Sequence, residues 1–179
     1  MKYRGILLVL CLLLPTVPAA ADTAAAGSYA TKVSLVRPAA TAATRPSKGW
    51  NCVAYARATG GFDLSGDGWR WWQNAAGVYD RAARPTVGAA LVFKRSGSMH
   101  QGHVAVVEAI YDERTVLVRH ANWAPRGARK GQISTEYVLD ISPLNDWTEV
   151  RVEHRPSHSY GRPNPTYGFV LPGRRVASR

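Results

Sequence analysis

Five short apolar runs after Pro85 constrain the fold of this chain more than any other feature. They cover residues 89–94, 103–111, 115–121, 147–153 and 167–171, and turn-forming residues separate them. Runs of this length that are rich in β-branched and aromatic residues are typical of β-strands. Because short connections join mostly antiparallel neighbours, we expect an antiparallel sheet of about five strands.

Two helical segments are expected before these strands. Residues 51–58 contain no Gly or Pro and are followed by Gly60 and Gly61, which suit a helix end. A second short helix is expected over residues 68–77, where Trp69 and Trp72 share one face and Trp71 points elsewhere. Helices first and strands afterwards predict an α+β fold in which N-terminal helices pack on the sheet.

The first 21 residues have the pattern of a secretory signal peptide. Lys2 and Arg4 precede an apolar run over residues 6–14, and Ala19 to Ala21 offer a cleavage site. We therefore expect a secreted protein, periplasmic or extracellular, after removal of residues 1–21. No apolar run reaches the roughly 20 residues that cross a bilayer, so stable membrane insertion is not expected.

The remaining chain divides into three parts by composition. Residues 22–47 are rich in Ala, Thr, Ser and Pro and predict a flexible arm, and residues 173–179 predict a tail. Residues 48–172 are long enough for one domain with its own core. Without the leader the chain has 21 basic and 12 acidic residues, a net charge of +9 that favours polyanionic partners. Nucleic acid is not the expected polyanion, because no dense Lys/Arg stripe is interleaved with the tryptophans.

The cysteine content is unusual for an exported protein. Cys11 leaves with the leader, so Cys52 has no second cysteine to pair with. An unpaired cysteine in such a chain is either a buried small hydrophobe or a reactive thiol. At the start of the first helix, unpaired N–H groups would favour the thiolate of Cys52.

A histidine base for this thiol is expected at the start of a strand. His103 opens the run 103–111, and the next run ends in His120, Ala121 and Asn122. With a two-residue hairpin loop, odd positions of the first strand share a face with even positions of the second. Either His120 or Asn122 could then orient His103. A three-residue loop would instead place both of them on the face opposite to His103.

Other residues near these positions have alternative interpretations. The Asn51 side chain could donate to an oxyanion or could cap the helix. Trp50 and Trp123 adjoin the proposed catalytic positions and are expected to line a substrate groove. His100, His103 and His120 could supply three zinc ligands, but nothing completes such a site, so no metal and no cofactor are expected.

The order of four blocks resembles the CHAP family of cysteine, histidine-dependent amidohydrolases and peptidases. The blocks are Asn51-Cys52-Val53-Ala54-Tyr55, Pro85-Thr86-Val87-Gly88, Gly102-His103-Val104-Ala105-Val106-Val107 and His120-Ala121-Asn122-Trp123. The resemblance implies a papain-like fold, Cys52 as nucleophile and His103 as base and acid. CHAP proteins usually have Gln where this chain has Asn51, and often Glu where it has His120. A related branch of wall hydrolases uses histidine as the third member, which favours Cys52, His103 and His120, with Asn122 in support.

These observations predict a secreted, cysteine-dependent peptidoglycan hydrolase. It would be an amidase or an endopeptidase that forms an acyl-enzyme on Cys52, with peptidoglycan or its peptide fragments as partner. The alternative is a non-catalytic basic domain that binds cell-wall fragments or other polyanions. The sequence does not indicate an oligomeric state.

Overall fold

The computed structural model describes residues 49–124 and 129–174. The predicted leader (1–21) and arm (22–47) lie outside these ranges, as does most of the predicted tail. The elements, in chain order, are α1 (Cys52–Gly60), η1 (Gly68–Arg70), α2 (Trp71–Asn74), β1 (Tyr79–Ala82), β2 (Ala90–Phe93), β3 (His103–Ile110), β4 (Thr115–Ala121), β5 (Ile133–Asp140), β6 (Glu149–His154), η2 (Arg155–Ser157), β7 (Ser159–Tyr160) and β8 (Asn164–Arg174).

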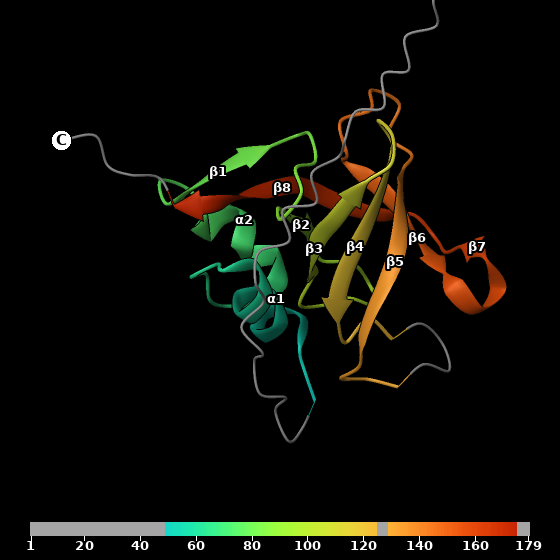
Figure 1. Ribbon diagram of the computed structural model, residues 1–179, viewed down its shortest axis with the longest axis horizontal. Helices are drawn as coiled ribbons and strands as arrows, with labels where there is room; N and C mark the ends of the chain where they lie inside the picture. Colours follow the sequence, from blue (N-terminus) through green and yellow to red (C-terminus); the bar gives the residue numbers. More distant parts are fainter. Residues whose placement is uncertain (1–48, 125–128, 175–179) are drawn as a thin grey trace, which may run out of the picture. The chain divides into compact units, whose positions relative to one another are not determined.

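The strands form a closed antiparallel barrel rather than a simple sheet. Strands β2 to β6 pair in sequence order, and β8 pairs with both β2 and β6, which closes a barrel of six strands. Strands β1 and β7 extend the sheet beside β8 and β6 (Figure 1). The barrel leaves fewer unpaired edges than an open sheet would.

The predicted fold class, α+β and papain-like with N-terminal helices packed on about five strands, is therefore wrong. The described part of the chain is mostly β, and its only α-helices are the short α1 and α2. Strand β5, at residues 133–140, was not expected, because polar residues interrupt its apolar positions. Closure was not expected either, since β8 is 11 residues long and pairs with strands far away in the sequence.

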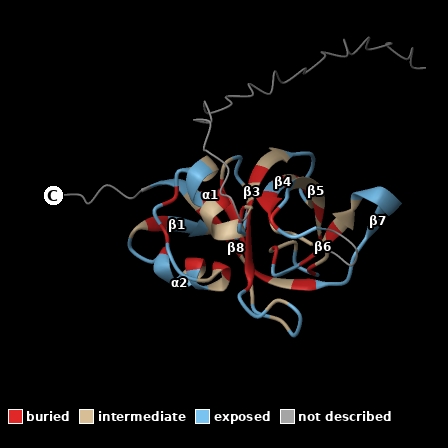
Figure 2. Cartoon of the chain, turned by 90° about the horizontal axis from the view of Figure 1, so that it is seen from below, coloured by how far each residue is buried: buried red, intermediate tan, exposed pale blue. Residues whose placement is uncertain are grey.

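Two apolar clusters lie on opposite sides of the barrel wall. The interior cluster includes Phe93, Trp147 and Phe169, all without exposed surface. The exterior cluster joins α1 and α2 to the outer side of the wall through Ala56, Trp71 and other residues. Buried residues accordingly follow the strands and the inner sides of the helices (Figure 2). No helix in the described ranges has the length and apolar composition needed to cross a membrane.

A bulge in β3 sets the faces of the two histidine-bearing strands. Tyr111 donates its backbone N–H to the carbonyl of Thr115, so three residues form the turn. Beside the turn Ile110 pairs with Val116, but beyond Glu108 the register shifts by one residue and Val107 pairs with Val118. Because of this extra residue, odd positions of β3 and even positions of β4 again share a face, as they would have done with a two-residue loop. The start of β3 and the end of β4 therefore direct His103 and His120 to the same side of the wall.

Gly102 fixes the start of β3, and a side chain there should destabilise the fold. Its φ is +60°, and an added Cβ would lie 2.7 Å from the carbonyl oxygen of Phe93 and from the backbone of Trp69. We expect Gly102→Ala to lower the free energy of unfolding by at least about 2 kcal/mol, since positive φ and a backbone clash both oppose alanine. Urea denaturation measures the change. Gly97→Ala is the matched control, because nothing lies within 4 Å of its added Cβ. Equal stability of the two variants would contradict this account.

Candidate active site

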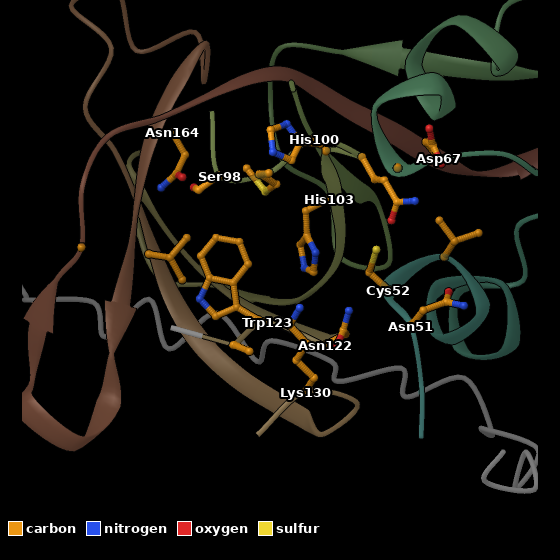
Figure 3. A pocket seen from close by; sticks show the side chains of 18 of the residues that line it. Asn51, Cys52, Asp67, Ser98, His100, His103, Asn122, Trp123, Lys130 and Asn164 are labelled. Atoms are coloured by element: carbon orange, nitrogen blue, oxygen red, sulfur yellow. The ribbon is translucent and has the colours of Figure 1, made fainter. Parts of the chain in front are cut away.

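The thiol of Cys52 lies at the first position of α1. Asn51 is the N-cap, in an extended conformation, and its side-chain Oδ1 accepts a hydrogen bond of 2.7 Å from the N–H of Ala54. Capping residues of this kind define where a helix begins. Of the two interpretations of Asn51, the structure places its carbonyl in the cap. Figure 3 shows this side chain on the helix side of Cys52, away from His103.

The environment of the thiol acts on its pKa in opposite directions. Burial raises the pKa of Cys52 above its ordinary value, and this effect prevails. The backbone N–H groups of Val104, Val53 and Cys52 itself lower it, while the charge of Asp67 raises it slightly. The helix start therefore does not by itself produce a thiolate. The contact with Val104 also brings the sulfur against the residue that follows His103.

The two histidines form a buried hydrogen-bonded pair. His103 Nε2 lies 3.0 Å from His120 Nδ1, and the two side chains come from neighbouring strands β3 and β4. His103 is 5% exposed and His120 is fully buried. His120 therefore occupies the position of the orienting partner of His103.

Glu136 extends this pair to a third side chain, which the sequence did not indicate. Its Oε2 lies 2.6 Å from His120 Nε2. Glu136 is on β5, where Val118 of β4 pairs with it, two positions from His120 on the same face. The strand containing it was not predicted, so the carboxylate was overlooked. The alternation Ser134, Glu136, Val138, Asp140 is the signal that could have shown an inward carboxylate.

The hydrogen bonds define which ring nitrogen of His103 is free. A carboxylate only accepts hydrogen bonds, so Glu136 accepts from the Nε2–H of His120. The Nδ1 of a neutral His120 then accepts from the Nε2–H of His103. This arrangement leaves the lone pair on His103 Nδ1, the nitrogen that does not take part in the chain of hydrogen bonds.

Aromatic rings exclude water from the histidine pair. The Trp123 ring stacks on His120 with centroids 5.4 Å apart and lies 5.0 Å from His103, and Phe93 is 5.6 Å from His103. Burial lowers the pKa of His103 well below its ordinary value, and the electrostatic interaction with the neighbouring His120 ring lowers it further. A neutral imidazole is the form that can accept a proton from a thiol.

The remaining predicted site residues are divided between the site and the core. Asn122 has a left-handed φ of 62°, and its Oδ1 accepts a hydrogen bond of 2.9 Å from the N–H of Gly131. Figure 3 shows its amide below His103 and Cys52. Trp50, expected in a substrate groove, is instead buried against Tyr55 and Ala121, because its ring packs edge-on to Tyr55 at 5.8 Å.

A cavity of about 1260 Å³ opens over these groups. Cys52, His103, Asn122 and Trp123 line it together with residues of the β2–β3 loop and of the segment before β8 (Figure 3). Its walls carry charges of both signs, with Asp67 near the thiol and with Lys130 and Arg162 elsewhere. Such a space suits an extended polar chain. Among the described residues, no three His, Cys, Asp or Glu side chains are grouped to hold a metal ion.

Comparison with known protein families gives one match. The family model of the CHAP domain matches residues 42–122. The match covers the proposed nucleophile and both histidines of the pair. The resemblance seen in the sequence is thereby confirmed. A comparison with curated proteins finds no match.

CHAP domains are typically peptidoglycan hydrolase domains with amidase or peptidase activity, and peptidoglycan is the substrate that the family implies. The matched CHAP segment includes Cys52, His103 and His120, whereas Trp123 and Glu136 lie beyond its end.

The lowered pKa of His103 predicts a loss of stability in mild acid. Between the ordinary histidine value of 6.5 and the lower native value, the unfolded chain binds a proton that the native chain does not. This contribution to stability is complete above pH 6.5 and falls as the pH decreases, by about 1.4 kcal/mol per pH unit where only the unfolded chain is protonated.

Urea denaturation from pH 7.5 to pH 5 measures this slope. We expect His103→Gln to flatten it, and we expect the exposed His158→Gln to leave it unchanged. The slope is the informative quantity, since His103→Gln also changes packing. An equal slope in His103→Gln and the unchanged chain would show that His103 is not the buried neutral group.

Proposed function

We propose that this protein is a secreted, cysteine-dependent peptidoglycan hydrolase, either an amidase or an endopeptidase. One observation carries the proposal: the Cys52 thiol lines the same cavity as His103, the first member of the hydrogen-bonded chain His103–His120–Glu136. The CHAP match supports amide hydrolysis as the reaction and peptidoglycan as the substrate class.

The reaction starts from a neutral pair. Burial raises the pKa of Cys52 and lowers that of His103, so both groups are uncharged before substrate binds. The thiol proton moves to His103 Nδ1 as the sulfur attacks the amide carbonyl carbon, and a tetrahedral intermediate forms. His103 then gives this proton to the amine nitrogen as the C–N bond breaks, leaving an acyl thioester on Cys52.

The second half of the reaction reverses the proton transfers. His103 takes a proton from a water molecule, whose oxygen attacks the thioester carbon. The C–S bond breaks, the proton returns to the sulfur, and the new carboxylic acid leaves. The oxyanion of each intermediate needs donors that are fixed beforehand. The backbone N–H of Cys52 at the helix start and the amide of Asn122 are suitable donors, since Asn51 is engaged in the cap.

Glu136 and His120 act as positioning residues. The imidazolium that forms on His103 is stabilised through His120 by the carboxylate of Glu136, which keeps its charge close to a water-poor site. Glu136 lines a second cavity of about 170 Å³ beside Trp123, and it is not among the residues that line the large cavity. Glu136 thus acts on the reaction without contacting substrate.

Replacement of the nucleophile should abolish cleavage. We expect mass spectrometry of purified peptidoglycan, digested with the unchanged protein, to reveal new amino and carboxyl ends that are missing with Cys52→Ala. The new ends identify the bond: an end between sugar and stem peptide indicates an amidase, and an end within the peptide indicates an endopeptidase. Identical digests at several pH values would reject the hydrolase and favour a non-catalytic binding domain.

Removal of the Glu136 charge should slow the reaction without weakening substrate binding. We expect Glu136→Gln to reduce kcat about a hundredfold, at the lower end of what a positioned acid–base group contributes, and to leave KM nearly unchanged. Because the protonated imidazole loses its anionic partner, the acid limb of the kcat/KM profile should move to lower pH. The exposed Glu149→Gln is the matched control. A reduced kcat with an unshifted pH profile would indicate a merely structural role.

A further inference from the structure

Four cations are held against aromatic rings on the outer side of the barrel. The first two are Arg81 and Lys94. The guanidinium carbon of Arg81 lies 4.9 Å from the centre of the Trp72 ring, and its Nη1 donates to the Trp72 carbonyl at 3.1 Å. Trp72 stacks on Tyr167 with centroids 5.8 Å apart and planes inclined by 10°. Lys94 Nζ lies 5.1 Å from the Tyr167 ring centre. Each of the two cations therefore contacts one ring of a stacked pair.

The other two cations share Trp69. The guanidinium carbon of Arg95 is 5.5 Å from the centre of this ring, and that of Arg70 is 5.1 Å away. Lys94 and Arg95 are neighbours in the chain, so the two groups join at the end of β2. We call the four cations Arg70, Arg81, Lys94 and Arg95 the cation–π row.

The cation–π row interleaves basic and aromatic side chains that are scattered in the sequence. Its members come from η1, β1 and the residues after β2, while the rings come from η1, α2 and β8. Figure 1 shows β1, β8 and α2 lying together on one side of the barrel. The sequence showed no such stripe, because the contacts between these elements are made only in the fold.

The cation–π row reaches the edge of the active-site cavity. Trp69 donates its backbone N–H to the carbonyl of Gln101, and an added Cβ on Gly102 would touch the Trp69 backbone. Gln101 and Gly102 both line the cavity. The β2–β3 loop thus carries Arg95 on its outer side and lines the cavity with its later residues. A chain that leaves the cavity over this loop passes directly onto the cation–π row.

The ring contacts suit these cations to binding anions. A guanidinium stacked on a ring keeps its N–H groups in its own plane, where they can bind a carboxylate in a bidentate manner. The contacts also limit the rotamers of long side chains that would otherwise lose freedom on binding. Because the faces of Trp69 and Trp72 are already in contact with cations, the site favours anions over sugar rings.

We propose that the cation–π row binds the stem-peptide carboxylates of the peptidoglycan strand whose neighbouring amide lies in the cavity. This inference rests on the proposed function, since its ligand is the polymer that Cys52 is proposed to cut. Continuity with the cavity and the opposite charge of the carboxylates support this ligand. The row holds an insoluble, repeating polymer close to the thiol through several weak contacts.

Binding by the catalytically blocked full-length protein tests the row independently of hydrolysis. All proteins carry Cys52→Ala and are sedimented with purified insoluble peptidoglycan at increasing salt. We expect Arg81→Gln/Arg95→Gln to bind several-fold more weakly at low salt than Arg57→Gln/Arg155→Gln, which loses the same charge at exposed positions elsewhere. The difference should disappear at high salt, because screening removes the advantage of the row. Thermal unfolding of each variant checks that both remain folded.

Two further ligands identify the partner. Amidation of the peptidoglycan carboxylates should remove the difference between the two double variants. Equal binding of both variants to unmodified peptidoglycan, or a difference that persists after amidation, would overturn the inference. So would a row-dependent difference found with DNA but not with peptidoglycan. If binding depends on the row while the protein with Cys52 intact leaves peptidoglycan uncut, the proposed function fails and the binding surface stands.

Discussion

The hydrogen bond between His103 and His120 is the interaction on which the site depends. Two imidazoles share one bond of 3.0 Å in a buried space, and each must therefore keep a defined tautomer. Glu136 selects that tautomer from the far side of His120, and Trp123 covers both rings. A polar chain of this kind is stable in an apolar setting only when every member has its partner. The same requirement leaves one nitrogen of His103 available to the cavity.

The sequence predicted the histidine pair for a reason that was only partly right. The parity argument assumed a two-residue turn, but three residues form the turn between β3 and β4. The bulge at Glu108 adds the second shift that returns His103 and His120 to one side of the wall. The third turn residue and the bulge each shift the strand pairing by one residue, so the two shifts cancel. Neither is readable from the apolar pattern, because a bulge changes pairing without changing the alternation on either side of it.

The fold and the fourth site residue were missed for a common reason. Strand β5 has Ser134, Thr135 and Glu136 where an apolar run would be expected, and its inward positions include two carboxylates. A carboxylate is not expected on the buried face of a strand unless a partner for its charge is known. The partner, His120, lies on a different strand. The pattern of apolar residues therefore predicts strands that build the core well, and it fails for the strand that builds the site. Without β5 the remaining strands cannot be arranged into a closed barrel.

Barrel closure and reactivity are linked through burial. The interior that excludes water from His103 lowers its pKa, and burial at the start of α1 raises that of Cys52. Both shifts favour neutral groups, which avoids the cost of an isolated ion pair in an apolar setting. In the proposed reaction the thiolate and imidazolium form together, as the proton crosses from Cys52 to His103. Their charges need stabilisation only at that moment, and the Glu136 carboxylate together with the N–H groups at the start of α1 provides it. Under the proposed mechanism, the raised pKa of Cys52 makes the thiol a poor nucleophile toward general electrophiles, whereas an amide held in the cavity beside His103 is attacked as the proton moves to the imidazole.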